Sequence, residues 1–505
     1  ESILRKYSGI GGDVETRLDQ YVRQKLGSHR FHYGFDYFLS PKSQINFYAF
    51  YNPYSQEYNG LAEAGTNRND KGQWQAVRVS ANMNKSTFYS LFYKHTFNDR
   101  GSELTFDISN YHLIGENSSI YTPGGLENGS ESIKNNSRPG QNAFSIKVDG
   151  IVPIGKNMNF NMGTKVKIQE MQDAHAADFL YSEKIFAAYG SFGYMRPKYD
   201  VNAGLRIENS VSELKNNFHN PVLSLLPFAT LNFKITSDQN MKMALSRTIY
   251  RPNIYQLNPN INIDDPYTVR RGNPFLNPEI RTAVFMEYSK KFKSNYVSAR
   301  LFYNRNNDAI NNLTFINDTS AFETRIYNLG TIHQLGFQFM GTLKLGSIIT
   351  FNPYLRLFGQ YTDGNQLANE FSILNRHQIV IEPGLSAILS FKHDFNLSMT
   401  FQYASPRNNI QGNSYSDALY FISFEKTFKK CFKAGIVSIL PLTRTFTYQG
   451  SEIKGPDFNS CYKGDIHFQD LLVSFKLSYQ FNTGKRQERI NRIHEDTDEI
   501  PKSGL

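Results

Sequence analysis

Side chains that could do chemistry are few and scattered in this sequence. Its 505 residues include 11 His and 2 Cys, and none of the motifs G-x-S-x-G, H-E-x-x-H or C-x-x-C occurs. Asp173, His175 and Asp178 share one polar segment and could be weighed as metal ligands, as could Asp264 and Asp265 for calcium. Both groups lack the spacing of a known ligand set. The sequence therefore predicts no catalytic residue, metal site or cofactor, and an enzyme is not expected.

The elements that would have to position any such groups are β-strands. Apolar and polar residues alternate from Met158 to Ile168, again around Leu104 to Ser109, and again from Val473 to Phe481. Such alternation gives a strand one apolar and one polar face. No stretch of 18 apolar residues occurs, so no transmembrane helix is expected. Alternation alone fits a soluble β-sandwich as well as a membrane barrel.

The connections between these strands separate the two alternatives. Short turns alternate with long polar segments, as in outer-membrane barrels, which have short periplasmic turns and long extracellular loops. The short turns are expected at Pro41-Lys42, 98–101, Gly155-Lys156, Pro197-Lys198, Ser237-Asp238, Lys293-Ser294, Gly346-Ser347, His393-Asp394 and Lys430-Cys431. The long loops are expected at 54–85, 113–141, 171–182, 212–221, 252–280, 306–321, 362–377, 405–416 and 448–466.

The fold class predicted is all-β, a large antiparallel transmembrane β-barrel of about 20–22 strands. About 19 strands can be placed from Phe31 to Phe481, and because bacterial barrels usually have an even number, at least one more strand should precede Phe31. Part of the segment 14–26 might supply it, and the sequence is expected to lack its N-terminal portion. The expected divisions are an N-terminal segment (1–29), the barrel (30–482) and a charged periplasmic tail (483–505).

Charge and cysteine content limit the possible partners. The net charge is +10 and the pI about 9.2, but many basic residues lie at short turns, where they can meet anionic lipid headgroups. No clustered basic stripe accompanies the charge, so nucleic-acid binding is not expected. Cys431 falls in a predicted periplasmic turn and Cys461 in a predicted outer loop, so no disulfide should join them across the bilayer.

One segment resembles a known family. Residues 246–279 read SRTIYRPNIYQLNPNINIDDPYTVRRGNPFLNPE, with the elements Arg251-Pro252, Gln256-Leu257-Asn258-Pro259, Asp265-Pro266 and Gly272-Asn273-Pro274-x-Leu276-x-Pro278-Glu279. This is similar to the long-loop signature of the outer-membrane β-barrel family related to TonB-dependent receptors of Bacteroidetes. The resemblance implies an integral protein of the Gram-negative outer membrane, with a plug and a TonB-contacting box before the barrel; neither part is visible in this sequence.

The resemblance also implies a function: a receptor barrel that takes up an unidentified nutrient, with outer-membrane lipid, TonB and a surface lipoprotein as partners. Five prolines stiffen the 252–278 loop, so a structural lid is favoured over direct ligand contact. The residues expected to face a substrate are Tyr250, Tyr255, Tyr267, Arg270 and Arg271. The alternative is a non-transporting barrel subunit of a larger outer-membrane complex, and an open pore is a third option.

Overall fold

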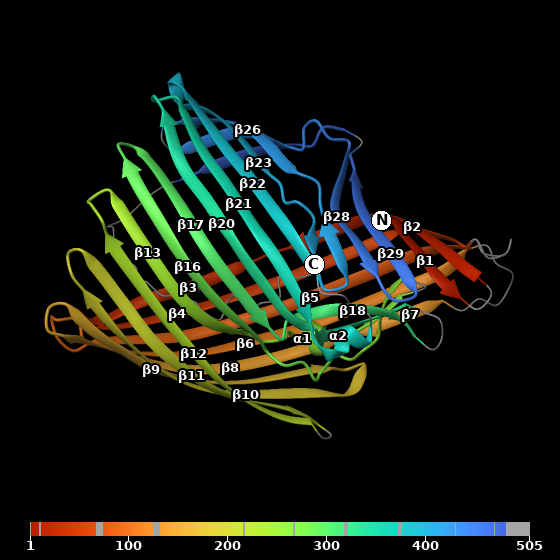
Figure 1. The fold of residues 1–505 in the computed structure, drawn as a ribbon, viewed down its shortest axis with the longest axis horizontal. Helices are drawn as coiled ribbons and strands as arrows, with labels where there is room; N and C mark the ends of the chain where they lie inside the picture. The colour runs from red at the N-terminus through yellow and green to blue at the C-terminus, as the bar shows by residue number, and fades with distance from the viewer. Residues whose placement is uncertain are drawn as a thin grey trace.

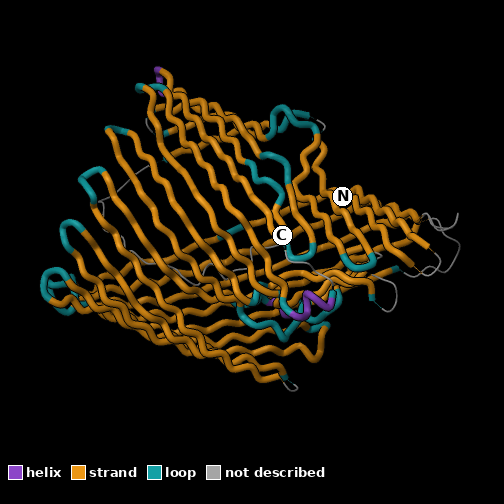
Figure 2. Tube along the Cα trace, viewed as in Figure 1, coloured by secondary structure: helices purple, strands orange, loops and turns teal. Residues whose placement is uncertain are grey.

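A computed structural model of the chain describes residues 2–9, 12–66, 74–124, 132–215, 218–265, 268–317, 322–371, 376–429, 431–468 and 470–480. Nearly all of them belong to one large antiparallel sheet that curves into a barrel wall (Figures 1 and 2). This confirms the all-β prediction. Within the described residues, no helix is long and apolar enough to cross a membrane.

The strands of the first half of the wall are β1 (Ser2–Gly9), β2 (Gly12–Ser28), β3 (Phe31–Ser40), β4 (Ser43–Thr66), β5 (Trp74–Thr96), β6 (Glu103–Gly124), β7 (Ile133–Ser137), β8 (Pro139–Ile154), β9 (Met158–Asp173), β10 (Ala176–Met195), β11 (Tyr199–Leu214), β12 (Phe218–Lys234) and β13 (Gln239–Tyr250). Those of the second half are β16 (Glu279–Phe292), β17 (Asn295–Asn307), β20 (Gly330–Leu345), β21 (Ile349–Gly364), β22 (Arg376–Phe391), β23 (Phe395–Gln402), β24 (Arg407–Asn408), β25 (Gly412–Tyr415), β26 (Leu419–Phe428), β27 (Phe432–Ile439), β28 (Thr445–Lys454), β29 (Phe458–His467) and β30 (Val473–Tyr479). Between the two halves lie α1 (Ile254–Leu257), β14 (Asn262–Asp265) and β15 (Thr268–Arg271), and within the second half lie β18 (Ile310–Ile316), β19 (Phe322–Asn328), α2 (Gln366–Glu370) and a 3-10 turn (Lys392–Asp394).

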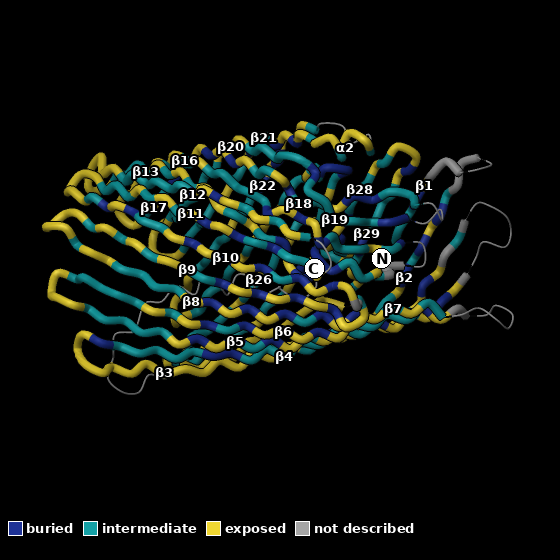
Figure 3. Tube along the Cα trace, turned by 90° about the horizontal axis from the view of Figure 1, so that it is seen from below, coloured by how far each residue is buried: buried dark blue, intermediate teal, exposed yellow. Residues whose placement is uncertain are grey.

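The two faces of the wall show which side is apolar. Along β9, Phe160, Met162 and Ile168 are 37–43% exposed, whereas Lys167 and Gln169, on either side of Ile168, are only 4% exposed. Exposed and buried residues alternate in this way along most strands (Figure 3). A soluble sandwich would bury the apolar face, so a wall that exposes it and keeps its polar face inside is suited to lipid.

Every predicted short turn connects two paired neighbouring strands. Several turns use backbone conformations with positive φ, as at Gly101 (86°), Gly155 (69°), Gly346 (64°) and Lys293 (54°). Glycine adopts this region at no steric cost, which explains its placement in these turns. We call this end of the barrel the turn end, and the opposite end the loop end.

Several of the predicted long loops are mostly strand, among them 54–85, 113–141, 171–182, 212–221 and 448–466. β4 and β5 are 24 and 23 residues long and remain paired from Ser43↔His95 to Ala64↔Trp74, while β6 extends to Gly124. Their polar composition indicated loops, and that prediction was wrong for most of 54–85 and 113–141. These strands continue beyond the apolar band, where both faces can be polar, and polar cross-strand pairs such as Gln75 Nε2 to Glu63 Oε1 (2.9 Å) replace apolar ones.

The N-terminal strands also differ from expectation. Both β2 and β3 pair with β4, from Thr16↔Thr66 to Ser40↔Ser43. Together they form one membrane-spanning strand that is interrupted at residues 29 and 30. The segment 14–26 is therefore the loop-end half of the strand that continues from Phe31, and it is not an additional strand. The additional strand is β1, which pairs with β2 on one side and β29 on the other. The expected boundary near residue 30 thus does not separate two units.

Two further predictions concern the C-terminal part of the chain. Cys431 and Cys461 are both free thiols, Cys431 at the β26–β27 turn and Cys461 within β29 at the loop end. The predicted tail, 483–505, lies outside the described residues.

Candidate functional site at the loop end

Loop segments fold back into the barrel at its loop end. Residues 251–278 between β13 and β16, residues 308–329 between β17 and β20, and residues 365–371 after β21 lie together there (Figure 1). We call the described parts of these three segments the lid. Their positions inside the ring of strand ends explain why the Pro-rich segment is not an exposed loop.

The helix α1 begins the first lid segment and is fixed by its own sequence. Asn253 caps it: the Asn253 side chain accepts hydrogen bonds from the backbone N–H groups of Tyr255 and Gln256, and the Gln256 side chain accepts from the Asn253 backbone N–H. Such a capping box satisfies backbone donors at a helix start. A single turn of helix is marginal alone, so its stability must come mainly from packing.

That packing is against the inner face of the wall. Ile254 and Leu257 are fully buried. They belong to a cluster formed with the inward-facing side chains of six wall strands, namely Phe50, Phe88, Tyr111, Leu113, Ala143, Met171, Phe179 and Tyr181. The lid therefore crosses the lumen from β13 to the inner face of β4 to β10. Burying two large aliphatic side chains contributes about 1.5–3 kcal/mol each.

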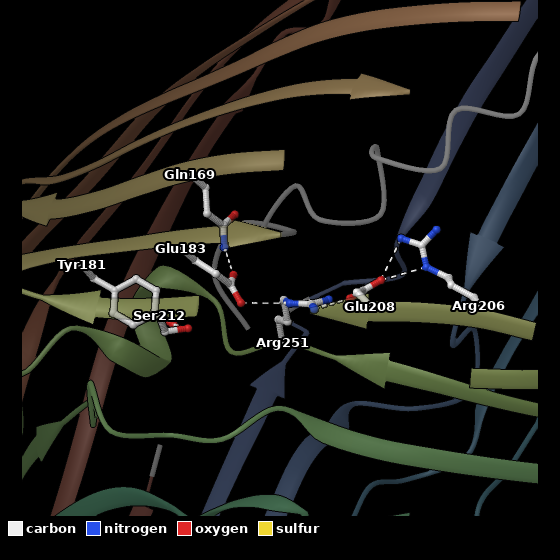
Figure 4. Close-up of polar contacts among 7 residues, drawn as sticks. All are labelled: Gln169, Tyr181, Glu183, Arg206, Glu208, Ser212 and Arg251. Carbon is white, nitrogen blue, oxygen red and sulfur yellow. Dashed lines mark hydrogen bonds and ion pairs between the residues drawn. The ribbon is translucent and has the colours of Figure 1, made fainter. Parts of the chain in front are cut away.

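Arg251 links the start of the lid to the wall by charge (Figure 4). Its Nε lies 3.0 Å from a carboxylate oxygen of Glu183 on β10, and its Nη2 donates to Glu208 on β11. Both carboxylate side chains are only 3% exposed, and the Arg251 side chain is 15% exposed.

The two carboxylates are held by the wall as well. Arg206 donates to Glu208 (2.8 Å), and Gln169 donates to Glu183 (2.5 Å), as Figure 4 shows. Arg251 is thus a bridge between two buried carboxylates that already have partners of their own. Its planar guanidinium can donate from separate N–H groups to two carboxylates at once.

Asp173, at the loop-end tip of β9, anchors the end of α1. Its carboxylate accepts hydrogen bonds from the Ser137 hydroxyl (2.6 Å), the Arg138 backbone N–H (2.9 Å), the His175 backbone N–H (2.9 Å) and the Asn258 amide (2.6 Å). Burial alone would raise the pKa of this carboxyl, but the four hydrogen bonds together hold it below its usual range. Asp173 is thus an acceptor that organises the lid.

The rest of the lid is a small sheet with its own core. β15 pairs with β14 antiparallel and with β19 in parallel, and β18 pairs with β19. Leu313, Leu329, Ala368 and Ile410 are at most 1% exposed and form its apolar cluster. Because these residues come from three chain segments, 308–329, 365–371 and the connection between β24 and β25, they pack together and do not form independent loops.

The lid is also fixed to the first and last strands. Arg5 of β1 donates to the Thr268 hydroxyl (2.5 Å) and stacks over the Phe322 ring at 4.8 Å. Phe322 in turn meets Phe458 of β29 edge to face, with ring centroids 5.3 Å apart. These contacts tie the lid to β1 and β29.

The five residues predicted to face a substrate lie in different places. Tyr250, at the end of β13, is 50% exposed, and Tyr255, on α1, is 37% exposed. The Tyr255 hydroxyl donates to Asn84 on β5 (3.4 Å). Arg270 is exposed on β15, and Tyr267 lies outside the described residues.

Arg271 has a structural contact. Its Nε lies 3.3 Å from Glu323, which also pairs with Arg325 at 2.5 Å. Burial alone would raise the pKa of Glu323, but the hydrogen bond and charge of Arg325, with Asn317 and Arg271, hold it below its usual range. Arg271 thus helps to hold β15 against β19.

Sequence reasoning missed the residues that hold the lid. Arg251 was noted only as part of a motif, Glu183 and Glu208 were not singled out, and Asp173 was weighed only as a weak metal ligand with His175 and Asp178. Among the residues that the structure describes, no group of three or more His, Cys, Asp or Glu is placed to hold a metal. The available signal was polarity on the inner face of β10 and β11, where Glu183 and Glu208 alternate with outward residues.

What this arrangement can do is restrict passage. A solute entering the lumen from the loop end meets a lid that is tied to the wall by buried ion pairs, by Asp173 and by apolar packing. Its accessible face carries aromatic and basic side chains, and such a surface suits binding better than bond-making chemistry.

Comparison with known proteins is consistent with this geometry. Residues 95–439 match the model of a family described as "Outer membrane protein beta-barrel family". A search of curated protein sequences gives no match.

Solved structures with a similar fold include the siderophore receptor PirA from Pseudomonas aeruginosa (TM-score 0.55, 11% identity, 92% of this chain and 79% of that chain) and the copper transporter OprC (TM-score 0.57, 10% identity, 92% and 80%). A third is a mutant of the ferric enterobactin receptor PfeA from Pseudomonas aeruginosa in complex with enterobactin (TM-score 0.54, 12% identity, 92% and 81%). At these identities the likeness is one of fold.

Proposed function

Because the chain belongs to the outer membrane protein beta-barrel family, and is an integral outer-membrane barrel with a receptor-like fold, we propose that it takes up a nutrient across the outer membrane. The loop end then faces the outside of the cell, as in other outer-membrane barrels. TonB and a surface lipoprotein are the partners we propose for energised uptake and for capture of the nutrient.

The observation that carries this proposal is the lid. A barrel used only as a scaffold has no need to close its lumen, whereas a receptor must keep solutes from leaking past a binding surface. Here three segments fold inward, and buried charges from β10 and β11 hold the first of them. We propose that Tyr250, Tyr255 and Arg270 contact the substrate, because all three are exposed on the lid or beside it.

The test is growth of a strain from which the gene has been deleted, on minimal media that each supply one nutrient. The first probes are those named for the structural neighbours, ferric enterobactin and Cu²⁺, followed by other iron chelates, glycans and peptides. We expect the deletion to impair growth on one nutrient and the wild-type gene to restore it. The double variant Tyr255→Ala/Arg270→Ala should restore growth only at higher nutrient concentration.

A matched control is Arg300→Gln, which changes an inner-face arginine that pairs with Glu287 in the wall and lies outside the lid. It should restore growth as the wild type does. Parental growth of the deletion strain across the whole panel, together with partners that co-purify in fixed ratio, would instead support the alternative of a non-transporting subunit of a larger complex.

A further inference from the structure

A lysine lies among aromatic side chains on the outward face of the wall, where β26 approaches the turn end. β26 pairs with β23, which pairs in turn with β22, and these strands lie side by side (Figure 1). Along β26, Phe424 and Phe428 are 41% and 40% exposed. Successive side chains of a strand point to opposite faces. Lys426, which lies midway between the two phenylalanines, therefore faces outward with them.

Lys426 contacts aromatic rings. Its Nζ lies 4.5 Å from the centroid of the Phe395 ring and 4.9 Å from that of the Phe428 ring. Phe395 is directly opposite Lys426 in the ladder between β23 and β26. Among the residues that the structure describes, no carboxylate forms an ion pair with Lys426. Aromatic rings attract a cation but do not neutralise its charge.

The inner face of the same strand pairs its lysine with a carboxylate. Glu425, the neighbour of Lys426, points into the lumen and lies 2.8 Å from the Nζ of Lys476 on β30. Lys426 faces lipid, and no such partner is found for it in the described part of the chain. A cation in this position has to reach either interfacial water or an anionic lipid headgroup.

The neighbouring rows of the ladder show the depth of Lys426 in the membrane. On the turn-end side, the outward rings of Phe428 and Phe432 have centroids 5.7 Å apart, and β26 ends at Phe428. Such aromatic girdles mark the headgroup level of a barrel. On the loop-end side, toward the membrane interior, the next outward residues are Leu397, Phe424 and Ile436. Lys426 thus lies at the periplasmic interface, with apolar surface toward the membrane interior.

Two further lysines lie in the adjoining turns. Lys392 is in the 3-10 turn between β22 and β23, Lys429 follows β26, and both are exposed. Phe391, which precedes Lys392, lies in the same row as Lys426, two strands away. Strand spacing and rise place the Cα atoms of Lys392 and Lys429 each about 10 Å from that of Lys426. Their flexible stems can bring the ammonium groups to one anion.

We call Lys392, Lys426 and Lys429 the turn-end patch. The described residues of the two turns include one carboxylate, Asp394, so positive charge is in excess. A soluble anion would use the lysines alone. A lipid would use both the lysines and the apolar rows beside them, and it is present at this depth in any outer membrane.

We propose that the turn-end patch is a binding site for an anionic phospholipid of the periplasmic leaflet. The three lysines bind the phosphodiester group. The first part of an acyl chain lies along the outward surface of Leu397, Phe424 and Ile436. A zwitterionic lipid carries a compensating cation on the same phosphate, so the patch should prefer a headgroup with net negative charge. This site is separate from the lid and from the nutrient that the barrel takes up.

The experiment is native mass spectrometry of the purified full chain in detergent, titrated with dimyristoyl phosphatidylglycerol or with dimyristoyl phosphatidylcholine, which has the same chains but a zwitterionic headgroup. We expect the wild type to retain phosphatidylglycerol preferentially. Each lysine near an anionic surface contributes about fivefold to binding, so Lys426→Leu should bind this lipid about fivefold more weakly. Lys392→Gln/Lys426→Leu/Lys429→Gln should bind it roughly 100-fold more weakly.

The matched control is Lys476→Gln, which removes a lysine from the inner face next to the patch. It should retain phosphatidylglycerol as the wild type does. Leucine suits a lipid-facing position, so Lys426→Leu alone serves if the triple variant does not fold.

Four results would overturn the proposal. One is equal retention of phosphatidylglycerol by the wild type and Lys426→Leu, with circular dichroism showing that both are folded. Another is equal retention of the two lipids by the wild type. A third is an equal loss of binding in Lys476→Gln, since net charge and not the outward position would then decide binding. The last is complete displacement of phosphatidylglycerol by excess inorganic phosphate, since the patch would then hold a free anion and not a lipid.

Discussion

Replacing Arg251 should release the lid from the barrel wall. In Arg251→Gln, the carboxylates of Glu183 and Glu208 lose the cation between them while both remain buried. Removing one partner of a buried ion pair costs about 3–5 kcal/mol, mostly because the remaining charge is left uncompensated. Arg206 still compensates Glu208 in part, so we take the lower figure, about 3 kcal/mol.

That cost falls on the lid more than on the wall. The wall strands are held by continuous ladders, such as Tyr181↔Leu214 to Met195↔Asp200 between β10 and β11. The first lid segment is held by separate side-chain contacts, among them those of Arg251 and Asp173, the α1 packing, the lid sheet and the hydrogen bond from Arg5 to Thr268. A local cost of about 3 kcal/mol raises the population of the opened lid by about 150-fold, at 1.4 kcal/mol for each factor of ten.

Limited trypsin digestion measures this opening. Trypsin can cut after Arg270 and Arg271 of β15, and mass spectrometry quantifies that cleavage alone. When opening is fast relative to cleavage, the rate follows the open population, so cleavage of Arg251→Gln should be on the order of 100-fold faster. Arg251→Lys, which keeps the charge but loses the fork, should be intermediate.

Arg300→Gln is the control, because it removes an arginine from a pair with Glu287 that lies on two wall strands, β17 and β16. It should leave cleavage at Arg270 and Arg271 unchanged. If Arg251→Gln is cleaved within twofold of the wild-type rate, the ion pairs do not hold the lid and the reasoning is refuted.

The remaining predictions concern other anchors of the lid and use hydrogen–deuterium exchange of residues 254–258, corrected for intrinsic rates. Because hydrogen bonds lower the pKa of Asp173, its contribution to lid stability is complete above the ordinary pKa near 3.9 and is lost as pH falls through the lowered pKa. Protection of residues 254–258 should therefore decrease in acid. Asp173→Asn should be less protected than the wild type at pH 7, and its protection should decrease less than that of the wild type when the pH is lowered. Leu257→Ala leaves a cavity in a fully buried site and should lower the opening free energy of α1 by about 2–5 kcal/mol; unchanged protection would contradict that packing. In Gly272→Ala the new Cβ would lie 2.4 Å from the Asn258 carbonyl oxygen, so protection should fall, whereas Gly101→Ala, which meets no neighbouring atom at a turn with φ of 86°, should leave the lid unchanged.

The wall of the barrel was largely predictable because its determinants are local. Alternation with a period of two specifies which side chains face lipid, and the turns at Pro41, Gly155 and Gly346 carry residues suited to tight reversal. The polar parts of β4 and β5 were not predictable in the same way. Outside the apolar band a strand has no apolar face, so its sequence resembles that of a loop.

The lid was only partly predictable. The prolines of 252–278 indicated a stiff segment over the mouth, and the structure places that segment inside it. The partner of Arg251 could not be read from the sequence, because Glu183 and Glu208 lie 68 and 43 residues away and meet it only through the register of β10 with β11. Likewise, the sequence did not indicate that β2 and β3 form one strand along β4, because residues 29 and 30 interrupt it.

The distances in sequence between the parts of the lid have a consequence for how the molecule folds. Arg5 and Thr268 are 263 positions apart, and Phe322 meets Phe458 of β29. Contacts of such high sequence separation form slowly, because chain entropy is lost before they stabilise anything. The hairpins, which join adjacent strands, can form early, whereas the contacts that tie the lid to Arg5 and Phe458 can form only when the first and last strands are already side by side. We therefore expect these anchors of the lid to form late in folding, after the hairpins of the wall.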